Sequence, residues 1–158
     1  MGKNLAMDAL DREILAQLQS DGRLTLTELA ERVGLSVSPC HRRLRALEQE
    51  GIIIGYRAQL DPAKVGLAFE ALVFVTMDKT SAEMVAAFEA AVAAVPHVIR
   101  AERLFGSPDY LLRVIAADLA AYQQLWDTHL ATLPGVQRVA STIVMKSIVH
   151  DRGLPLQG

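Results

Sequence analysis

The feature that constrains the fold most is an internal repeat with a spacing of 38 residues in the second half of the 158-residue chain. Val95-Pro96-His97-Val98 aligns with Leu133-Pro134-Gly135-Val136, and Phe88 aligns with Trp126. Each copy reads as a strand, a helix, a proline-containing turn and a second strand. We therefore expect strands over 69–77, 98–104, 110–116 and 136–146, with helices over 81–94 and 119–133. Two such copies make a ferredoxin-like βαββαβ sandwich with both helices on one face of an antiparallel sheet.

The first strand of this sandwich is apolar on both of its faces. Alternate side chains from Phe69 to Met77 can pack beneath the helices, which leaves Leu72 and Phe74 on the opposite face. A sheet that is covered on one side only usually alternates apolar and polar residues. We therefore expect a second subunit to cover the open face, so that the protein is at least a dimer.

The first half of the chain contains two short helices joined by a turn. Thr25 and Glu28 have the spacing of a capping box at the start of the first helix. Gly34 suits the end of that helix, because a positive φ costs glycine little. We expect Ser38 to be the N-cap of the second helix and Pro39 to be its first residue. Two helices with this kind of turn form a helix-turn-helix.

The second of these helices carries a basic cluster, His41-Arg42-Arg43-Leu44-Arg45. The net charge of -2 does not exclude nucleic acid, because a binding footprint is a local patch. The default interpretation of a charge run is a solvated helix face, but the Ser-Pro start after a glycine turn favours a helix that reads double-stranded DNA. Arginines would then contact phosphates, and residues near the helix start would contact bases. The predicted DNA-contacting residues are Ser36, Ser38, Pro39, Cys40, His41, Arg42, Arg43 and Arg45.

Cys40 leaves two interpretations open. A lone cysteine is usually a small buried hydrophobic residue. A helix N-terminus with arginines nearby can instead lower the pKa of a thiol and make it reactive, as in a redox sensor. A single cysteine cannot form an intrachain disulfide, which fits a reducing cytoplasm.

Two more elements are expected, one before the helix-turn-helix and one after it. A further helix is expected from Asp8, its N-cap, to about Gln19. The alternating segment Ile52–Leu60 predicts a linker strand whose backbone groups need a partner, which a second subunit can supply.

No apolar run approaches the ~18 residues that span a bilayer, and no signal peptide is recognisable, so we expect a cytoplasmic protein. The chain is expected to divide into four segments: a helix-turn-helix domain (1–51), a linker strand (52–66), a ferredoxin-like domain (67–150) and a flexible tail (151–158).

With these parts in order, the chain resembles the Lrp/AsnC, or feast/famine, family of bacterial and archaeal transcription regulators over about residues 8–150. The resemblance implies an α+β protein with an N-terminal winged helix-turn-helix and a C-terminal ferredoxin-like domain that binds an effector and mediates oligomerisation. It also implies a pseudo-palindromic DNA operator, and homodimers that assemble further, in the family often into octamers. The motifs that carry it are Asp8-Ala-Leu-Asp11-Arg-Glu-Ile-Leu15, Asp21-Gly22-Arg23, Leu29-Ala30-Glu-Arg-Val-Gly-Leu-Ser36, Arg42-Arg-Leu-Arg-Ala-Leu-Glu48, Glu50-Gly51-Ile-Ile-Ile-Gly-Tyr56, Phe105-Gly106-Ser-Pro-Asp109-Tyr110-Leu-Leu and Leu133-Pro134-Gly135-Val136.

The resemblance further implies that a small effector, usually an amino acid, binds between dimers near the loop Gly106-Ser107-Pro108-Asp109-Tyr110. Taken alone, these residues fit a tight hairpin equally well, since Gly, Pro and Asp all favour turns. Asp109 suits the α-amino group of an effector, and free loop amides suit its carboxylate. Thr142 on the last strand is a further candidate for lining the same cleft.

The sequence gives no indication of metal or cofactor chemistry. His97, His129 and His150 have no second ligand at metal spacing, so we expect no metal site and no cofactor. Dinucleotide, P-loop, zinc-protease and nucleophile-elbow motifs are absent, so we do not expect an enzyme. The alternative hypothesis is an oligomeric ferredoxin-like small-molecule-binding protein or enzyme with no DNA role, in which changing Arg42 and Arg43 to Ala leaves function intact.

Overall fold

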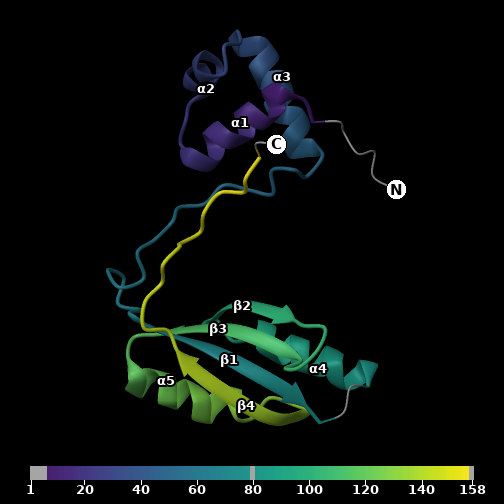
Figure 1. The fold of residues 1–158 in the computed structure, drawn as a ribbon, viewed down its shortest axis with the longest axis vertical. Helices are drawn as coiled ribbons and strands as arrows, with labels where there is room; N and C mark the ends of the chain where they lie inside the picture. Colours follow the sequence, from purple (N-terminus) through teal and green to yellow (C-terminus); the bar gives the residue numbers. More distant parts are fainter. Residues whose placement is uncertain (1–6, 79–80, 157–158) are drawn as a thin grey trace. The chain divides into compact units, whose positions relative to one another are not determined.

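The structure is a computed structural model that describes residues 7–78 and 81–156, drawn as a ribbon in Figure 1. The chain divides into two compact units. The helical unit comprises the described parts of residues 1–59 and 149–158, and the sheet unit comprises those of residues 60–148. Within the described ranges, no helix has both the length and the hydropathy that crossing a membrane requires.

The helical unit contains α1 (Ala9–Ser20), α2 (Leu26–Arg32) and α3 (Val37–Gln49) (Figure 1). Asp8 caps α1 as predicted, because its carboxylate accepts a hydrogen bond from the Asp11 amide at 2.9 Å. Thr25 and Glu28 form the predicted capping box of α2. The three helices enclose a buried core made of Ile14, Leu15, Leu29, Ala30, Val33, Cys40 and Leu47.

The turn before α3 differs from the prediction by two residues. Ser36 is the N-cap, not Ser38, and its side chain makes no capping hydrogen bond. Pro39 therefore lies at the third helical position rather than the first. Its missing N–H still costs nothing there, because the first four amides of a helix have no intrahelical acceptor. Gly34 adopts a φ of 69° just after α2, which confirms the predicted helix end, and Gly51 ends α3 in the same way with a φ of 70°.

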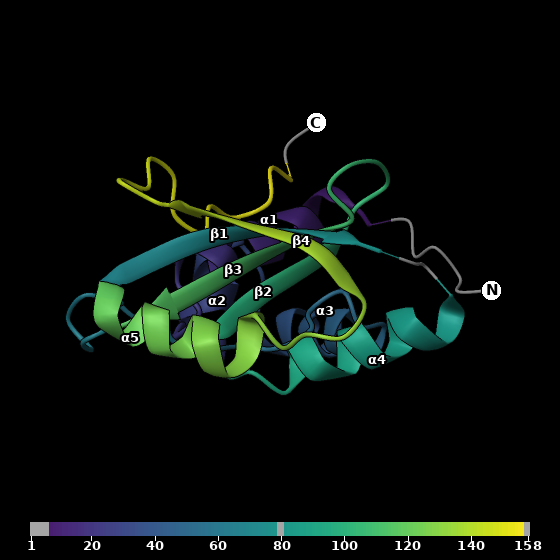
Figure 2. The same ribbon diagram turned by 90° about the horizontal axis from the view of Figure 1, so that it is seen from below.

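The sheet unit is the predicted βαββαβ sandwich. Its strands are β1 (Phe69–Met77), β2 (Val98–Arg103), β3 (Tyr110–Ala116) and β4 (Val136–Ile143). They form an antiparallel sheet in the order β2-β3-β1-β4. The helices are α4 (Ala82–Ala93) and α5 (Leu119–Leu125), and α5 continues as the π-turn η1 (Trp126–Leu130). Figure 2 shows both helices on one face of the sheet, which leaves the other face open.

The two faces of β1 are used as predicted. Ala71, Val73 and Val75 are fully buried beneath the helices. Leu72 and Phe74 lie on the opposite face and are only half-buried. In the register of the sheet Leu111 stands opposite Phe74, so it extends the apolar strip of the open face onto β3.

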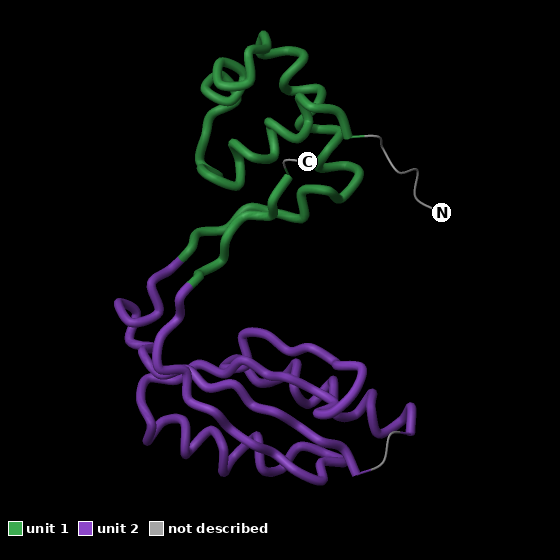
Figure 3. Tube along the Cα trace, in the orientation of Figure 1, with its two compact units in different colours: residues 1–59, 149–158 green, residues 60–148 purple. Residues whose placement is uncertain are grey.

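The linker and the tail differ from the predictions (Figure 3). Residues 52–68 contain turns and extended segments but no strand, because no strand among the described residues pairs with them. The tail is not a free extension. Its described residues, up to 156, belong to the helical unit, and Leu156 packs against that unit's core. Residues 157–158 of the predicted tail lie outside the described residues.

Candidate functional site

One face of α3 is polar and exposed. Ser38, His41, Arg42 and Arg45 are all exposed, and their spacing of three or four residues places them on the same side of the helix. Within residues 7–78 and 81–156, neither Arg42 nor Arg45 lies within ion-pair distance of a carboxylate. The predicted contact residues Ser36 and Pro39 lie at the start of the same helix, exposed and half-buried respectively. This face therefore offers two guanidinium groups, an imidazole and hydroxyls to an external anion.

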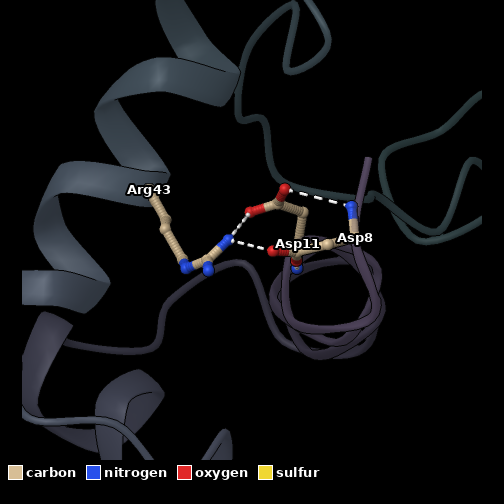
Figure 4. Close-up of polar contacts among 3 residues, drawn as sticks. All are labelled: Asp8, Asp11 and Arg43. Atoms are coloured by element: carbon tan, nitrogen blue, oxygen red, sulfur yellow. Dashed lines mark hydrogen bonds and ion pairs between the residues drawn. The ribbon is translucent and has the colours of Figure 1, made fainter. Parts of the chain in front are cut away.

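Arg43 is engaged within the helical unit. Its Nη1 lies 2.7 Å from Oδ2 of Asp8 and 2.9 Å from Oδ1 of Asp11, both at the start of α1 (Figure 4). The Asp11 amide and the Arg43 guanidinium hold the pKa of Asp8 below its usual value. Asp11 is buried, so Arg43 supplies a charge partner to a carboxylate inside the unit. The sequence predicts that Arg43 contacts DNA, but in this structure its guanidinium joins α3 to α1.

Cys40 is also turned away from the exposed face. Its side chain is fully buried in the core of the helical unit, and burial raises the pKa of the thiol. A buried thiol cannot contact DNA, which corrects the inclusion of Cys40 among the contact residues. A raised thiol pKa also opposes a reactive thiolate, so the structure favours the hydrophobic interpretation of Cys40 over the sensor.

The predicted effector loop joins β2 to β3 and is anchored by Asp109. The Asp109 amide donates to the carbonyl of Val75 at 2.9 Å, and its Oδ2 accepts from the Met77 amide at 2.8 Å. The Asp109 carbonyl accepts from the Leu104 amide at 2.7 Å and closes the hairpin. The bonds to Val75 and Met77 thus fix the loop to β1, and among the described residues Oδ1 is the carboxylate oxygen without a hydrogen-bond partner. Gly106 has a φ of 136°, a conformation that favours glycine.

Tyr110 points into the sheet unit instead of toward the loop. Its ring packs against Phe88 with a centroid distance of 4.5 Å, and its hydroxyl donates to Oε1 of Glu89 at 2.9 Å. Burial and the neighbouring Glu89 raise the pKa of Tyr110. Tyr110 and Glu89 line an open cavity of about 260 Å³ between α4 and β2, together with Phe88, Val92, Val98 and Arg103. Part of the polar set that the sequence suggested for this loop therefore stabilises the fold, since Tyr110 bonds Glu89 and Asp109 bonds Met77.

Thr142 is not brought to the loop within one chain. It is exposed on β4 and stands opposite Leu72 of β1. Asp109 contacts β1 at Val75 and Met77, which lie three to five residues farther along the strand, or roughly 10–17 Å at ~3.3 Å per residue. A single chain therefore does not form the predicted cleft from both elements. The described residues also contain no group of three side chains suited to hold a metal ion.

Comparisons with known proteins match the two parts of the chain to two family models. Residues 7–54 match the family model of a winged helix-turn-helix DNA-binding domain, and residues 70–154 match that of the Lrp/AsnC ligand binding domain. The chain is 38% identical over 151 residues to the DNA-binding transcriptional activator DecR of Escherichia coli, covering 96% of this chain and 99% of DecR. It is 35% identical over 155 residues to the leucine-responsive regulatory protein of Haemophilus influenzae, covering 98% and 93% respectively.

The fold has a close match among solved structures. A transcriptional regulator from Neisseria meningitidis, solved in complex with L-methionine, superimposes with a TM-score of 0.90 at 41% identity. The match covers 94% of this chain and 96% of that one, so it includes both units.

Proposed function

Because the chain belongs to the Lrp/AsnC family of transcriptional regulators, we propose that it binds a pseudo-palindromic operator through α3 and responds to an apolar amino acid. The observation that carries the DNA part is the exposed face of α3. Arg42 and Arg45 contact phosphates there, while Ser36, Ser38 and His41 contact base edges near the helix start. Arg43 holds α3 against α1 and contributes to binding by positioning the helix.

The open face of the sheet supports a homodimer. Leu72, Phe74 and Leu111 form a half-buried apolar strip there, and a second copy of the chain removes this strip from water. A dimer presents two α3 helices to two half-sites one helical turn apart, about 34–36 Å. Assembly of dimers into higher oligomers, up to the octamer, and a cytoplasmic location follow from the family and are part of the proposal.

The effector site of the proposal lies between dimers at the β2–β3 loop. The side chain of Phe105 is fully exposed at this loop, which supports a neighbouring subunit packing against it. Oδ1 of Asp109 accepts from the α-amino group of the effector, and amides of Gly106 and Ser107 bind its carboxylate. Thr142 of a neighbouring subunit completes the cleft. The apolar class of amino acid is supported by the L-methionine complex of the Neisseria meningitidis regulator and by the leucine-responsive relative.

A DNA-binding titration tests the proposal. Purified protein is titrated onto the promoter fragment upstream of its own gene, with excess nonspecific DNA, in the presence and absence of leucine and methionine. The expected result is a discrete complex that one amino acid alters, that Arg42→Ala weakens, and whose amino-acid response Asp109→Asn abolishes. Unchanged binding by an Arg42→Ala, Arg45→Ala double variant contradicts the assignment of α3. An intact response in Asp109→Asn contradicts the assignment of the loop.

A further inference from the structure

The end of the chain is bound to the first helix of the helical unit. Nε2 of Gln19 donates to the carbonyl of Leu154 at 3.2 Å, and the Leu154 amide donates to Oε1 of Gln19 at 2.5 Å. The Gln19 amide group therefore satisfies both backbone groups of Leu154, as a neighbouring strand would. Nη1 of Arg12 donates to the carbonyl of Leu156 at 3.1 Å. We name residues 152–156 the C-terminal strap.

Packing reinforces these hydrogen bonds. Leu156 packs against the core of the helical unit, so the strap ends in an apolar anchor. A Cβ atom on Gly153 would lie only 3.1 Å from Oε1 and 3.3 Å from Cβ of Gln19, so the absence of a side chain allows the strap to approach α1 closely. Arg12 and Gln19 are seven residues apart and therefore lie on one face of α1. The strap follows this face from the end of α1 toward its beginning.

Docking of the strap gives the helical unit a second connection to the sheet unit, in addition to the linker. The chain passes between the two units twice, at residues 59–60 and again at residues 148–149 (Figure 3). The first connection is the linker, which contains no strand. The second runs from β4 to the strap. A unit held by one flexible segment samples many positions, and a second attachment removes much of that freedom.

We propose that the C-terminal strap is a second tether of the helical unit. It restricts the positions that this unit can take and so makes the protein selective for the spacing of operator half-sites. The segment that binds this face of α1 is the chain's own C-terminal strap. It is held through the amide and carbonyl of Leu154, the carbonyl of Leu156 and the apolar side chain of Leu156. The inference rests on the proposed binding of two half-sites by a dimer. Docking of the strap itself is tested without DNA.

The docking test is a disulfide. The Cβ position at residue 153 lies 3.3 Å from Cβ of Gln19, close to the ~3.5–4.5 Å that disulfides require, and the backbone of Gly153 is not in the left-handed region. The double variant Gln19→Cys, Gly153→Cys is expected to oxidise to an intrachain crosslink that runs at the monomer mass on a non-reducing gel. Each single variant is a control, since the native Cys40 is buried. No crosslink, or a crosslink at the dimer mass, overturns docking of the strap on its own chain.

The functional test varies the DNA. Operators carry their half-sites at the native spacing or with five additional base pairs, which turns one half-site to the opposite side of the duplex. The full-length protein is expected to bind the altered operator at least about tenfold more weakly than the native one. A variant that ends at Arg152 should bind the altered operator less than about threefold more weakly than the native one, because its helical unit can reposition. The oxidised double variant should keep the full penalty.

Two further variants guard against an unfolded truncation. Leu156→Ser keeps the chain length and removes the apolar anchor, and Gln19→Ala removes the hydrogen bonds to Leu154. Both are expected to relax the spacing penalty while the helical content measured by circular dichroism stays constant. An equal spacing penalty in all variants overturns the tether even if the disulfide forms. Loss of binding to every operator by the full-length protein instead refutes the proposed function.

Discussion

Arg42 and Arg43 are neighbours in sequence but are predicted to contribute to DNA binding in different ways. Arg42 is exposed on α3 and forms no ion pair among the described residues, so its charge is available to a phosphate. Arg43 is bound to Asp8 and Asp11 on α1. Arg42→Ala should therefore reduce the salt dependence of operator binding, whereas Arg43→Ala should weaken binding by a similar factor at every salt concentration.

The size of the Arg42 effect follows from counterion release. Each phosphate contact contributes about 0.9 to the slope of log affinity against log salt concentration. A dimer loses two such contacts, so the slope should fall by about 1.8. Between about 50 and 200 mM salt, a fourfold change, the affinity of the wild type should drop about 12-fold more than that of Arg42→Ala. For Arg43→Ala the slope should equal the wild-type slope within error.

Fluorescence anisotropy with a labelled operator at several concentrations of KCl measures these slopes. Arg43→Lys is the matched control, because it keeps the charge but loses the paired geometry of the guanidinium with two carboxylates. It should behave like Arg43→Ala in slope. If Arg43→Ala flattens the slope as much as Arg42→Ala, Arg43 contacts phosphate in the complex, and its role in positioning α3 is refuted.

Three further predictions concern the fold that carries the site. Leu47→Ala, at a fully buried position of α3, should lower the free energy of unfolding by about 2–5 kcal/mol in a urea titration. Cys40 should react with a maleimide on the order of 100-fold more slowly in the native protein than in denaturant, because its thiol is buried and its pKa is raised. Partial burial and the hydrogen bond to Glu48 raise the pKa of Tyr56 from 10.0 to about 12. The stability that Tyr56 contributes is therefore present below pH 10 and is lost as the pH rises toward 12, and absorbance titration of wild type against Tyr56→Phe should detect this group.

The sheet unit is largely predictable from the sequence because its signals are local. Alternation and apolar periodicity locate each element, and the bounds of β1 and β3 match the prediction at Phe69–Met77 and Tyr110–Ala116. The start of α3 is harder to predict from the sequence, because Ser36 and Ser38 both suit an N-cap. The absent linker strand has a different cause: a strand exists only where another strand pairs with it.

The docked tail could not be predicted for a third reason. Gln19 and Leu154 are 135 residues apart, and the backbone groups of Leu154 carry no sequence signal at all. The same limit applies to the candidate sites. Residue type marks Arg43 and Asp109 as able to bind a ligand, but only the tertiary structure shows that Nη1 of Arg43 is bound to Asp8 and Asp11 and that Oδ2 of Asp109 accepts from the Met77 amide of β1.

This use of polar motif residues inside the fold has a consequence for specificity. A buried or half-buried polar group that is satisfied by the protein fixes geometry, because breaking its bonds leaves an unpaired group in a medium of low dielectric constant. Arg43 and Asp109 therefore set where α3 and the β2–β3 loop stand, and exposed neighbours such as Ser38, His41 and Arg42 are the residues free to differ between operators. Exchanging those exposed residues for the ones at the same positions of a relative should change which operator is bound, provided that the Arg43 ion pairs are kept. The same exchange combined with Arg43→Ala should weaken binding to both operators without choosing between them, since the helix then lacks the contact that aims it.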